Sequence, residues 1–126
     1  MKKLFVVVLA FLFLSGCSSK VPTPDDVDKI GKGMDEDKVV EILGEPSSKT
    51  TDRKEIENQY YAISTVVASN TDTYYELSVV SDAINNKENV EVFDYETDKK
   101  NQHIIIFFVD DEAQYFYSVD YGSSDN

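Results

Sequence analysis

The residues of this chain that could do chemistry are few and far apart. Catalysis by a nucleophile or a general base needs two such groups within hydrogen-bond reach, usually with a third group that orients the base. The chain has one His, His103, which begins an apolar segment after a charged turn, a pattern that predicts the edge of a strand. No second His is present to complete a zinc or iron site. We therefore expect no catalytic residue, and a hydrolase that uses carboxylates is the weakest of the functions considered.

Three short acidic clusters are the remaining candidates for a cation site: Asp25-Asp26-Asp28, Asp35-Glu36-Asp37 and Asp110-Asp111-Glu112. Carboxylate oxygens bind Ca²⁺, but none of the clusters has the spaced Asp…Gly…Glu pattern of a calcium-binding loop. The first two clusters coincide with predicted helix N-termini and the third with a predicted turn. The expectation is solvated caps and a turn, with no metal and no cofactor.

The single Cys, Cys17, stands at the end of an apolar run that starts after Met1-Lys2-Lys3. A basic start, eleven uncharged residues from Leu4 to Leu14 and the small residues Ser15-Gly16 before a Cys are typical of a lipoprotein signal peptide. As a helix such a run rises about 17 Å, roughly half the hydrocarbon thickness of a bilayer, so no permanent span is predicted. The segment resembles the bacterial lipobox. That resemblance implies cleavage before Cys17, a diacylglyceryl group on its thiol and attachment to a membrane through this lipid.

The charge of the chain limits its partners. Removal of residues 1–16, with Lys2 and Lys3, would leave 110 of the 126 residues and change the formal charge from −12 to −14. Nucleic acid and anionic headgroups would repel such a chain, so the lipid must be the anchor and nucleic acid is not an expected partner. We expect a tether over residues 17–22, one domain over residues 23–122 and a tail over residues 123–126.

Two helices are predicted at the start of this domain. The first begins at Thr23-Pro24, with Thr23 as its N-cap, and ends before Gly31. The second is capped by Asp35 and ends at Gly44 in a left-handed C-cap, with Pro46 beyond it. Its buried face should hold three apolar residues at i, i+3, i+4 spacing: Val39, Ile42 and Leu43.

The second helix also carries a family resemblance, in three spaced groups of residues: Gly33-Met34, Val39 and Leu43-Gly44-Glu45-Pro46. They resemble the Gly-Met…Val…Leu-Gly-x-Pro signature of the SmpA/OmlA, or BamE-like, family of small envelope lipoproteins. The resemblance implies two helices packed on a three-stranded antiparallel sheet and, in bacteria with two membranes, a role in outer-membrane protein assembly. Because the motif describes a helix and a turn, the implied function is a non-enzymatic interaction or assembly module.

The middle of the chain gives conflicting signals. Ile56, Tyr60, Ile63 and Val67 follow helical spacing, whereas the β-branched run over residues 63–67 favours a strand. A helical insertion between the second helix and the sheet, over residues 50–89, is the preferred interpretation.

The end of the chain predicts an antiparallel meander of three strands, over residues 88–95, 103–109 and 113–121. Residues on both faces of the middle strand are apolar, so both faces need a cover. The two helices should cover one face, and the insertion, a second copy or a partner protein should cover the other. The predicted fold class is α+β, with two N-terminal helices on a three-stranded antiparallel sheet and a helical insertion.

Tyrosine is frequent, with eight residues in the chain, and three of them project to one side of the last strand: Tyr115, Tyr117 and Tyr121. They either pack across strands or form a partner-binding face, and they are the candidate partner-binding residues. The expected partner is an envelope protein. The alternative is an inhibitor or ligand-binding domain on the cell surface, resembling the β-lactamase-inhibitor type of fold and binding through its sheet face. The expected location is the outer face of the cytoplasmic membrane, or the outer membrane where one exists.

Overall fold

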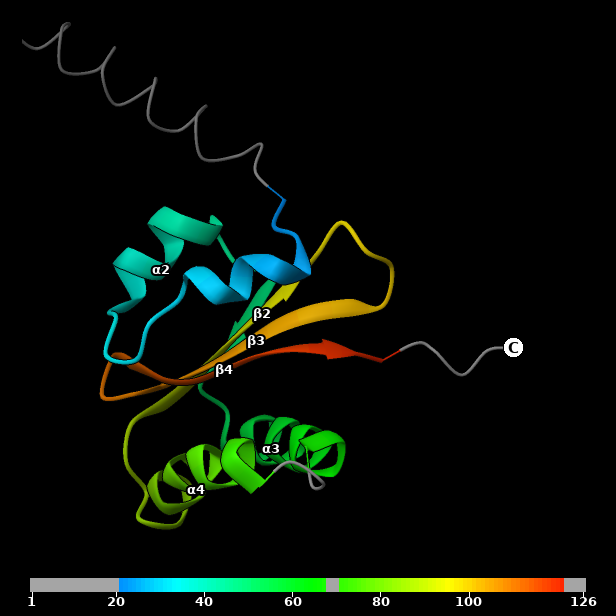
Figure 1. The fold of residues 1–126 in the computed structure, drawn as a ribbon. Coiled ribbons are helices and arrows are strands. Elements are labelled where there is room, and N and C mark those ends of the chain that lie inside the picture. The colour runs from blue at the N-terminus through cyan, green and yellow to red at the C-terminus, as the bar shows by residue number, and fades with distance from the viewer. Residues whose placement is uncertain (1–20, 68–70, 122–126) are drawn as a thin grey trace, which may run out of the picture.

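An antiparallel sheet of four strands lies in the middle of the structure, with helices on both of its faces (Figure 1). The computed structural model describes residues 21–67 and 71–121. The strands are adjacent in the order of the sequence: β1 (Ser48–Thr50), β2 (Val90–Glu96), β3 (Gln102–Val109) and β4 (Glu112–Asp120). The predicted α+β class and the meander of β2, β3 and β4 are confirmed, while the signal peptide, Cys17 and the tail lie outside the described residues.

The predicted number of three strands is wrong, because β1 adds a fourth. Ser48 pairs with Asp94 and Thr50 with Val92, in antiparallel register. Ser48-Lys49-Thr50 contains no apolar residue and so has no alternation that could indicate a strand. Pairing with β2 holds these polar residues in extended conformation.

Two short helices form one layer, which lies above the sheet in Figure 1: the 3-10 helix η1 (Pro24–Lys29) and the helix α2 (Glu36–Leu43). Asp35 caps α2 as predicted, since its Oδ1 accepts a hydrogen bond from the Lys38 N–H at 2.8 Å. Gly44 ends α2 with φ +88° and ψ −172°, so the predicted positive φ is confirmed, but ψ is extended rather than left-handed helical. The apolar residues under this layer form one buried cluster: Ile30, Val39, Leu43, Phe93, Tyr95, Ile104, Ile106, Phe108 and Ala113.

Two longer helices, α3 (Arg53–Val67) and α4 (Thr71–Asn85), cover the opposite face of the sheet (Figure 1). The predicted helical segment is therefore confirmed, but it lies between β1 and β2 rather than between the second helix and the sheet. The strand interpretation of residues 63–67 is wrong. The hydroxyls of Ser64 and Thr65 both donate to the Tyr61 carbonyl at 2.9 Å, which accommodates these residues within a helix. A second buried cluster joins these helices to the sheet: Ile56, Ile63, Leu77, Val80, Ala83, Ile84, Val90, Val92, Ile105, Phe107, Val109, Tyr115 and Val119.

The chain thus covers both faces of its own sheet. The two apolar sides of β3 belong to the two clusters, with Ile104, Ile106 and Phe108 on one side and Ile105, Phe107 and Val109 on the other. What the fold leaves unpaired is the rim of the sheet, and above all the outer edge of the nine-residue strand β4 beyond its first residues.

Candidate functional site

The structure divides the three tyrosines for which cross-strand packing and a partner-binding face were both left open. Tyr115 is only 2% exposed and belongs to the cluster under α3 and α4. Tyr117 is half-buried against the same cluster, with its ring stacked on that of Tyr115 at a centroid distance of 6.3 Å. Tyr121 is 45% exposed. The packing alternative therefore describes Tyr115 and Tyr117, which α3 and α4 cover in full or in part, whereas Tyr121 is the most accessible of the three.

Burial leaves the Tyr115 hydroxyl without a partner. No described group forms a hydrogen bond with it. Burial raises the pKa of Tyr115 well above its usual value of 10.0, and the nearby Tyr117 and Glu76 raise it further. A neutral, unpartnered hydroxyl in the core contributes nothing to binding and has a cost in stability, because it loses its hydrogen bonds to water on folding.

Tyr121 takes part in a small polar cluster at the end of the sheet. His103 Nδ1 and Asp94 Oδ1 are 2.6 Å apart on the neighbouring strands β3 and β2. The ring of Tyr121 meets the His103 ring edge-on at a centroid distance of 5.2 Å, and its hydroxyl donates to Gln59 Oε1 at 3.4 Å. Next to this cluster, a cleft of about 370 Å³ lies between β1 and α3, lined in part by Asp94, Asn58 and Tyr121.

The groups around His103 limit the chemistry that this cluster could perform. The Asp94 carboxylate accepts from the imidazole and fixes its orientation, as in the base of many catalytic sites. Among the described residues, however, no hydroxyl or thiol is recorded as a hydrogen-bond partner of His103. The arrangement therefore provides an oriented imidazole beside a polar cleft, without an activated nucleophile. The sequence placed His103 at a strand edge; its pairing with Asp94 depends on the β2–β3 register.

A second polar feature joins α2 to β2. Glu36, the first residue of α2, has its pKa raised to about 7, mainly by burial and then by a hydrogen bond and the charge of Glu91, with Asp111 contributing. Lys49 opposes this shift. A proton on the Glu36 carboxyl explains how the two acidic side chains can lie together. Within residues 21–67 and 71–121, no group of three or more His, Cys, Asp or Glu residues is arranged to hold a metal ion.

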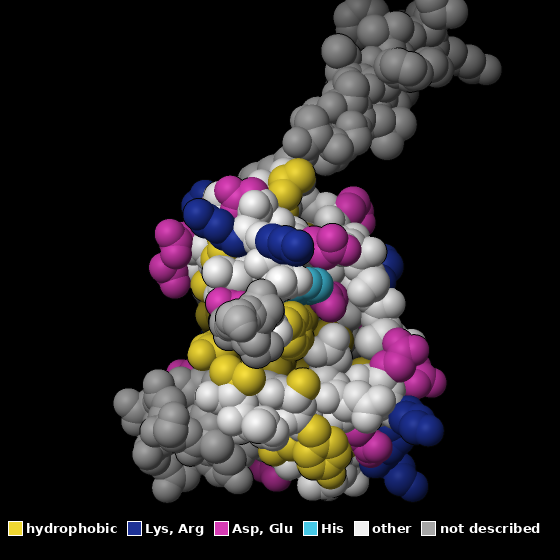
Figure 2. Space-filling view, turned by 90° about the vertical axis from the view of Figure 1, so that its right-hand side faces the viewer, with side chains coloured by type: hydrophobic (Ala, Val, Ile, Leu, Met, Phe, Trp, Pro, Cys, Tyr) yellow, Lys and Arg dark blue, Asp and Glu magenta, His cyan; other side chains and the backbone are white. Residues whose placement is uncertain are grey.

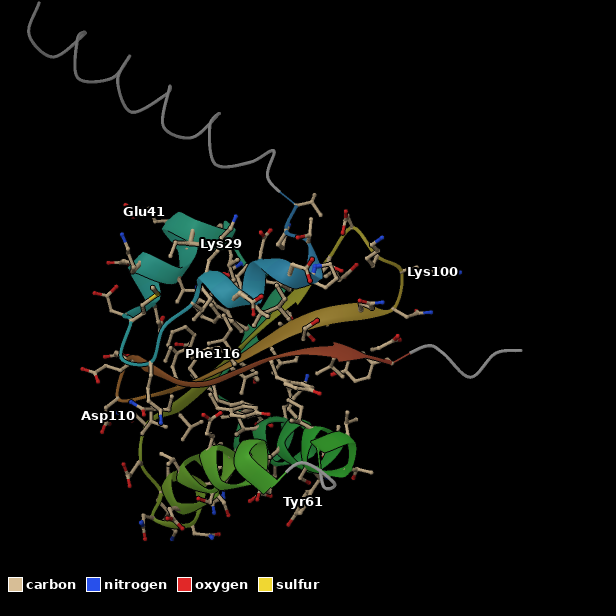
Figure 3. All side chains as sticks on the ribbon, in the orientation of Figure 1. Lys29, Glu41, Tyr61, Lys100, Asp110 and Phe116 are labelled. Atoms are coloured by element: carbon tan, nitrogen blue, oxygen red, sulfur yellow. The ribbon has the colours of Figure 1, made fainter. Side chains whose placement is uncertain are left out.

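A third feature is a groove that follows the outer edge of β4, which we call the edge groove. Its cavity measures about 390 Å³, and it is lined by Val27, Asp28 and Ile30 from the η1 region and by Phe116, Tyr117 and Ser118 from β4. Figure 3 shows Phe116 on the η1 side of β4. In the space-filling view, hydrophobic side chains gather in a band between the two helical layers, with charged side chains above and below it (Figure 2). The edge groove combines apolar walls with an exposed strand edge, the chemistry of a peptide-binding surface.

Comparison of the chain with protein-family models, with curated proteins and with solved structures finds no match. The SmpA/OmlA resemblance therefore stays a prediction from the residues. In the described part of the chain, no helix has both the length and the apolar character needed to cross a bilayer.

Proposed function

We propose that this protein is a lipid-anchored component of the bacterial cell envelope that acts as a non-enzymatic interaction module. The observation that carries the anchoring is the run from Leu4 to Leu14 followed by Ser15-Gly16-Cys17, directly after a basic start. A lipid on Cys17 would hold the domain at the membrane, since each buried methylene adds about 0.8 kcal/mol of membrane affinity. The acidic body has no attraction of its own for an anionic surface.

The interaction role is supported by the positions of the polar and apolar groups in the fold. Three residues of the Gly-Met…Val…Leu-Gly-x-Pro motif have a structural role, because Val39 and Leu43 are fully buried and Gly44 has positive φ. His103 is paired with Asp94 and has no recorded hydroxyl partner among the described residues. The edge groove joins apolar side chains to a strand edge, and it is the described surface on which we base the interaction role.

The inhibitor-like alternative placed its binding surface on a sheet face. Both faces carry a buried cluster and a helical layer, so in the described residues this form of binding is restricted to openings such as the polar cleft between β1 and α3. We therefore favour the anchored interaction module over the inhibitor-like domain.

Metabolic labelling with an alkyne fatty acid tests the anchoring. Wild type and a Ser19→Ala control should both incorporate the label and sediment with membranes, whereas Cys17→Ala should do neither, because the thiol is the acceptor of the lipid. Equal labelling of the Cys17→Ala variant and wild type would overturn the proposal.

A further inference from the structure

The outer edge of β4 presents unused backbone groups. The Tyr121 N–H donates to the Asn101 carbonyl of the β3 side at 2.8 Å. In an antiparallel pair, successive residues of a strand point their N–H and C=O groups alternately toward and away from the neighbouring strand. Counting back from Tyr121, Val119 and Tyr117 bond to β3, whereas the N–H and C=O groups of Ser118 and Phe116 point away from it. No hydrogen bond from a described residue is recorded for these outward groups of Phe116 and Ser118.

The chain itself already adds backbone to the beginning of this edge. The Gly33 N–H donates to the Ala113 carbonyl at 2.7 Å, and the Ala113 N–H donates to the Met34 carbonyl at 2.7 Å. Asp35 and Glu112 form an antiparallel bridge beside them. A register shift between Phe107 and Phe108, where Gln114 is the extra residue of β4, then separates this occupied part of the edge from the open part. The edge is therefore competent for strand addition, and the chain fills only its first part.

Beyond the bulge at Gln114, the open part of the edge lacks two of the residue types that normally prevent pairing, Lys and Pro. Soluble proteins protect edge strands with Lys, Pro or a covering element. Residues 115–120 contain neither Lys nor Pro and are rich in aromatic residues. An added strand would direct alternate side chains to opposite faces, where Val27 and Phe116 form one wall of the edge groove and Tyr117 lies on the other side.

Charge argues for the kind of strand that this edge accepts. The exposed Asp28 lines the edge groove, and the chain carries 24 Asp and Glu against 12 Lys and Arg. A second copy would bring the same excess of negative charge to the contact, which opposes association. A segment with Lys or Arg would be attracted instead.

We propose that the edge of β4 binds an extended, positively charged segment of another protein, which pairs with Phe116 and Ser118 as a fifth strand. This inference rests on the proposed interaction function and specifies the mode of binding and the chemistry of the partner. Main-chain hydrogen bonds would supply affinity, and the edge groove and Asp28 would supply selectivity.

A display library of random peptides of about nine residues, selected on the full-length protein in detergent micelles, tests the inference. Pro at position 118 removes the outward N–H, whereas the bonds to β3 come from the neighbouring positions. The selected peptides should be free of Pro, alternate apolar residues with Lys or Arg, and bind Ser118→Pro at least about tenfold more weakly than wild type. Ser118→Ala, which keeps the N–H, should bind like wild type.

Because Ser118→Pro could lose binding by failing to fold, a second measurement modifies the peptide and leaves the protein unchanged. The best selected peptide, N-methylated at alternate residues along one edge, should lose binding to wild type. The inference is overturned if no peptide is enriched, if the enriched peptides are acidic, if N-methylation on either edge has no effect, or if a dimer of the protein occupies the edge. If a captured partner binds at another surface, the inference about the β4 edge is wrong but the proposed interaction function is not. If no partner is found at the membrane, the proposed function itself is wrong.

Discussion

The same substitution should lower stability at one buried tyrosine and not at the other. Tyr95 and Tyr115 are 1% and 2% exposed and lie on opposite faces of the sheet. The Tyr95 hydroxyl donates to the buried carbonyl of Gly44 at 2.8 Å, whereas the Tyr115 hydroxyl has no described partner. Phe in place of each residue keeps the ring and removes only the oxygen.

The magnitudes follow from what each oxygen does. Tyr95→Phe breaks a buried hydrogen bond and leaves the Gly44 carbonyl without this donor, which should cost about 1–3 kcal/mol. Tyr115→Phe removes a hydroxyl that was buried without compensation, so its effect should lie between zero and a gain of about 1–3 kcal/mol. The difference corresponds to melting temperatures that are separated by at least about 4–8 °C.

Urea denaturation of the full chain and of both variants, followed by far-UV circular dichroism, measures the two free energies of unfolding. Equal losses at the two positions would refute the reasoning, because Tyr115 would then have a hydrogen-bond partner and the layer of α3 and α4 would not pack on the sheet as described. An unchanged slope of free energy against urea concentration is the control for a comparable unfolding reaction.

Three further predictions test other parts of the fold. Ile63→Ala should cost about 2–5 kcal/mol because Ile63 is fully buried under the sheet, whereas Val66→Ala, at a 48% exposed position of the same helix, should cost under about 0.5 kcal/mol in the same urea assay. Gly44→Ala should cost about 1–3 kcal/mol because φ is +88° and ψ −172°, a conformation that is strained for any residue with a Cβ. Gly31→Ala is its control, since the new Cβ would meet only an ordinary contact at 3.7 Å. The pKa of Glu36 is raised from 4.5 to about 7, so the folded state holds a proton that the unfolded state releases, and this contribution to stability should be full below pH 4.5 and lost as the pH rises to about 7. Glu36→Gln should remove that part of the pH dependence, and parallel pH profiles for wild type and Glu36→Gln would contradict the raised pKa of Glu36.

The parts of the fold that the sequence predicted are those with agreeing local signals. Asp35 at the N-cap, the buried face of α2 and the stop at Gly44 all lie within ten residues. The structure confirms the cap, the burial of Val39 and Leu43 and the stop, whereas Ile42 is only partly buried and the ψ angle of Gly44 differs. The β2–β4 meander has long apolar strands separated by charged turns. The first and last residues of these strands differ from the predicted ones by at most two positions. Local patterns were sufficient there because packing and propensity favour the same conformation.

The remaining features depend on tertiary contacts that local patterns do not carry. The β-branched residues of α3 favoured a strand, but burial of Ile56 and Ile63 on one face and bonding of Ser64 and Thr65 to Tyr61 favour the helix. Strand β1 is polar and forms through its pairing with β2. The sheet face that holds Tyr115 is buried because α3 and α4 pack on it. The edge groove could not be foreseen, because it joins η1 to a strand far along the chain.

Photo-crosslinking in intact cells tests the central claim, an anchored module with a protein partner at the β4 edge. A photoreactive phenylalanine analogue would replace Ser118 in one variant and Tyr61 in another, since Tyr61 is 65% exposed on α3 and points away from the sheet (Figure 3). The account predicts one discrete crosslinked product for position 118, with a partner site that contains Lys or Arg in an extended segment, no such product for position 61, and loss of the product when Cys17 is replaced by Ala. The same products from both positions, or a product that persists unchanged without Cys17, would contradict it.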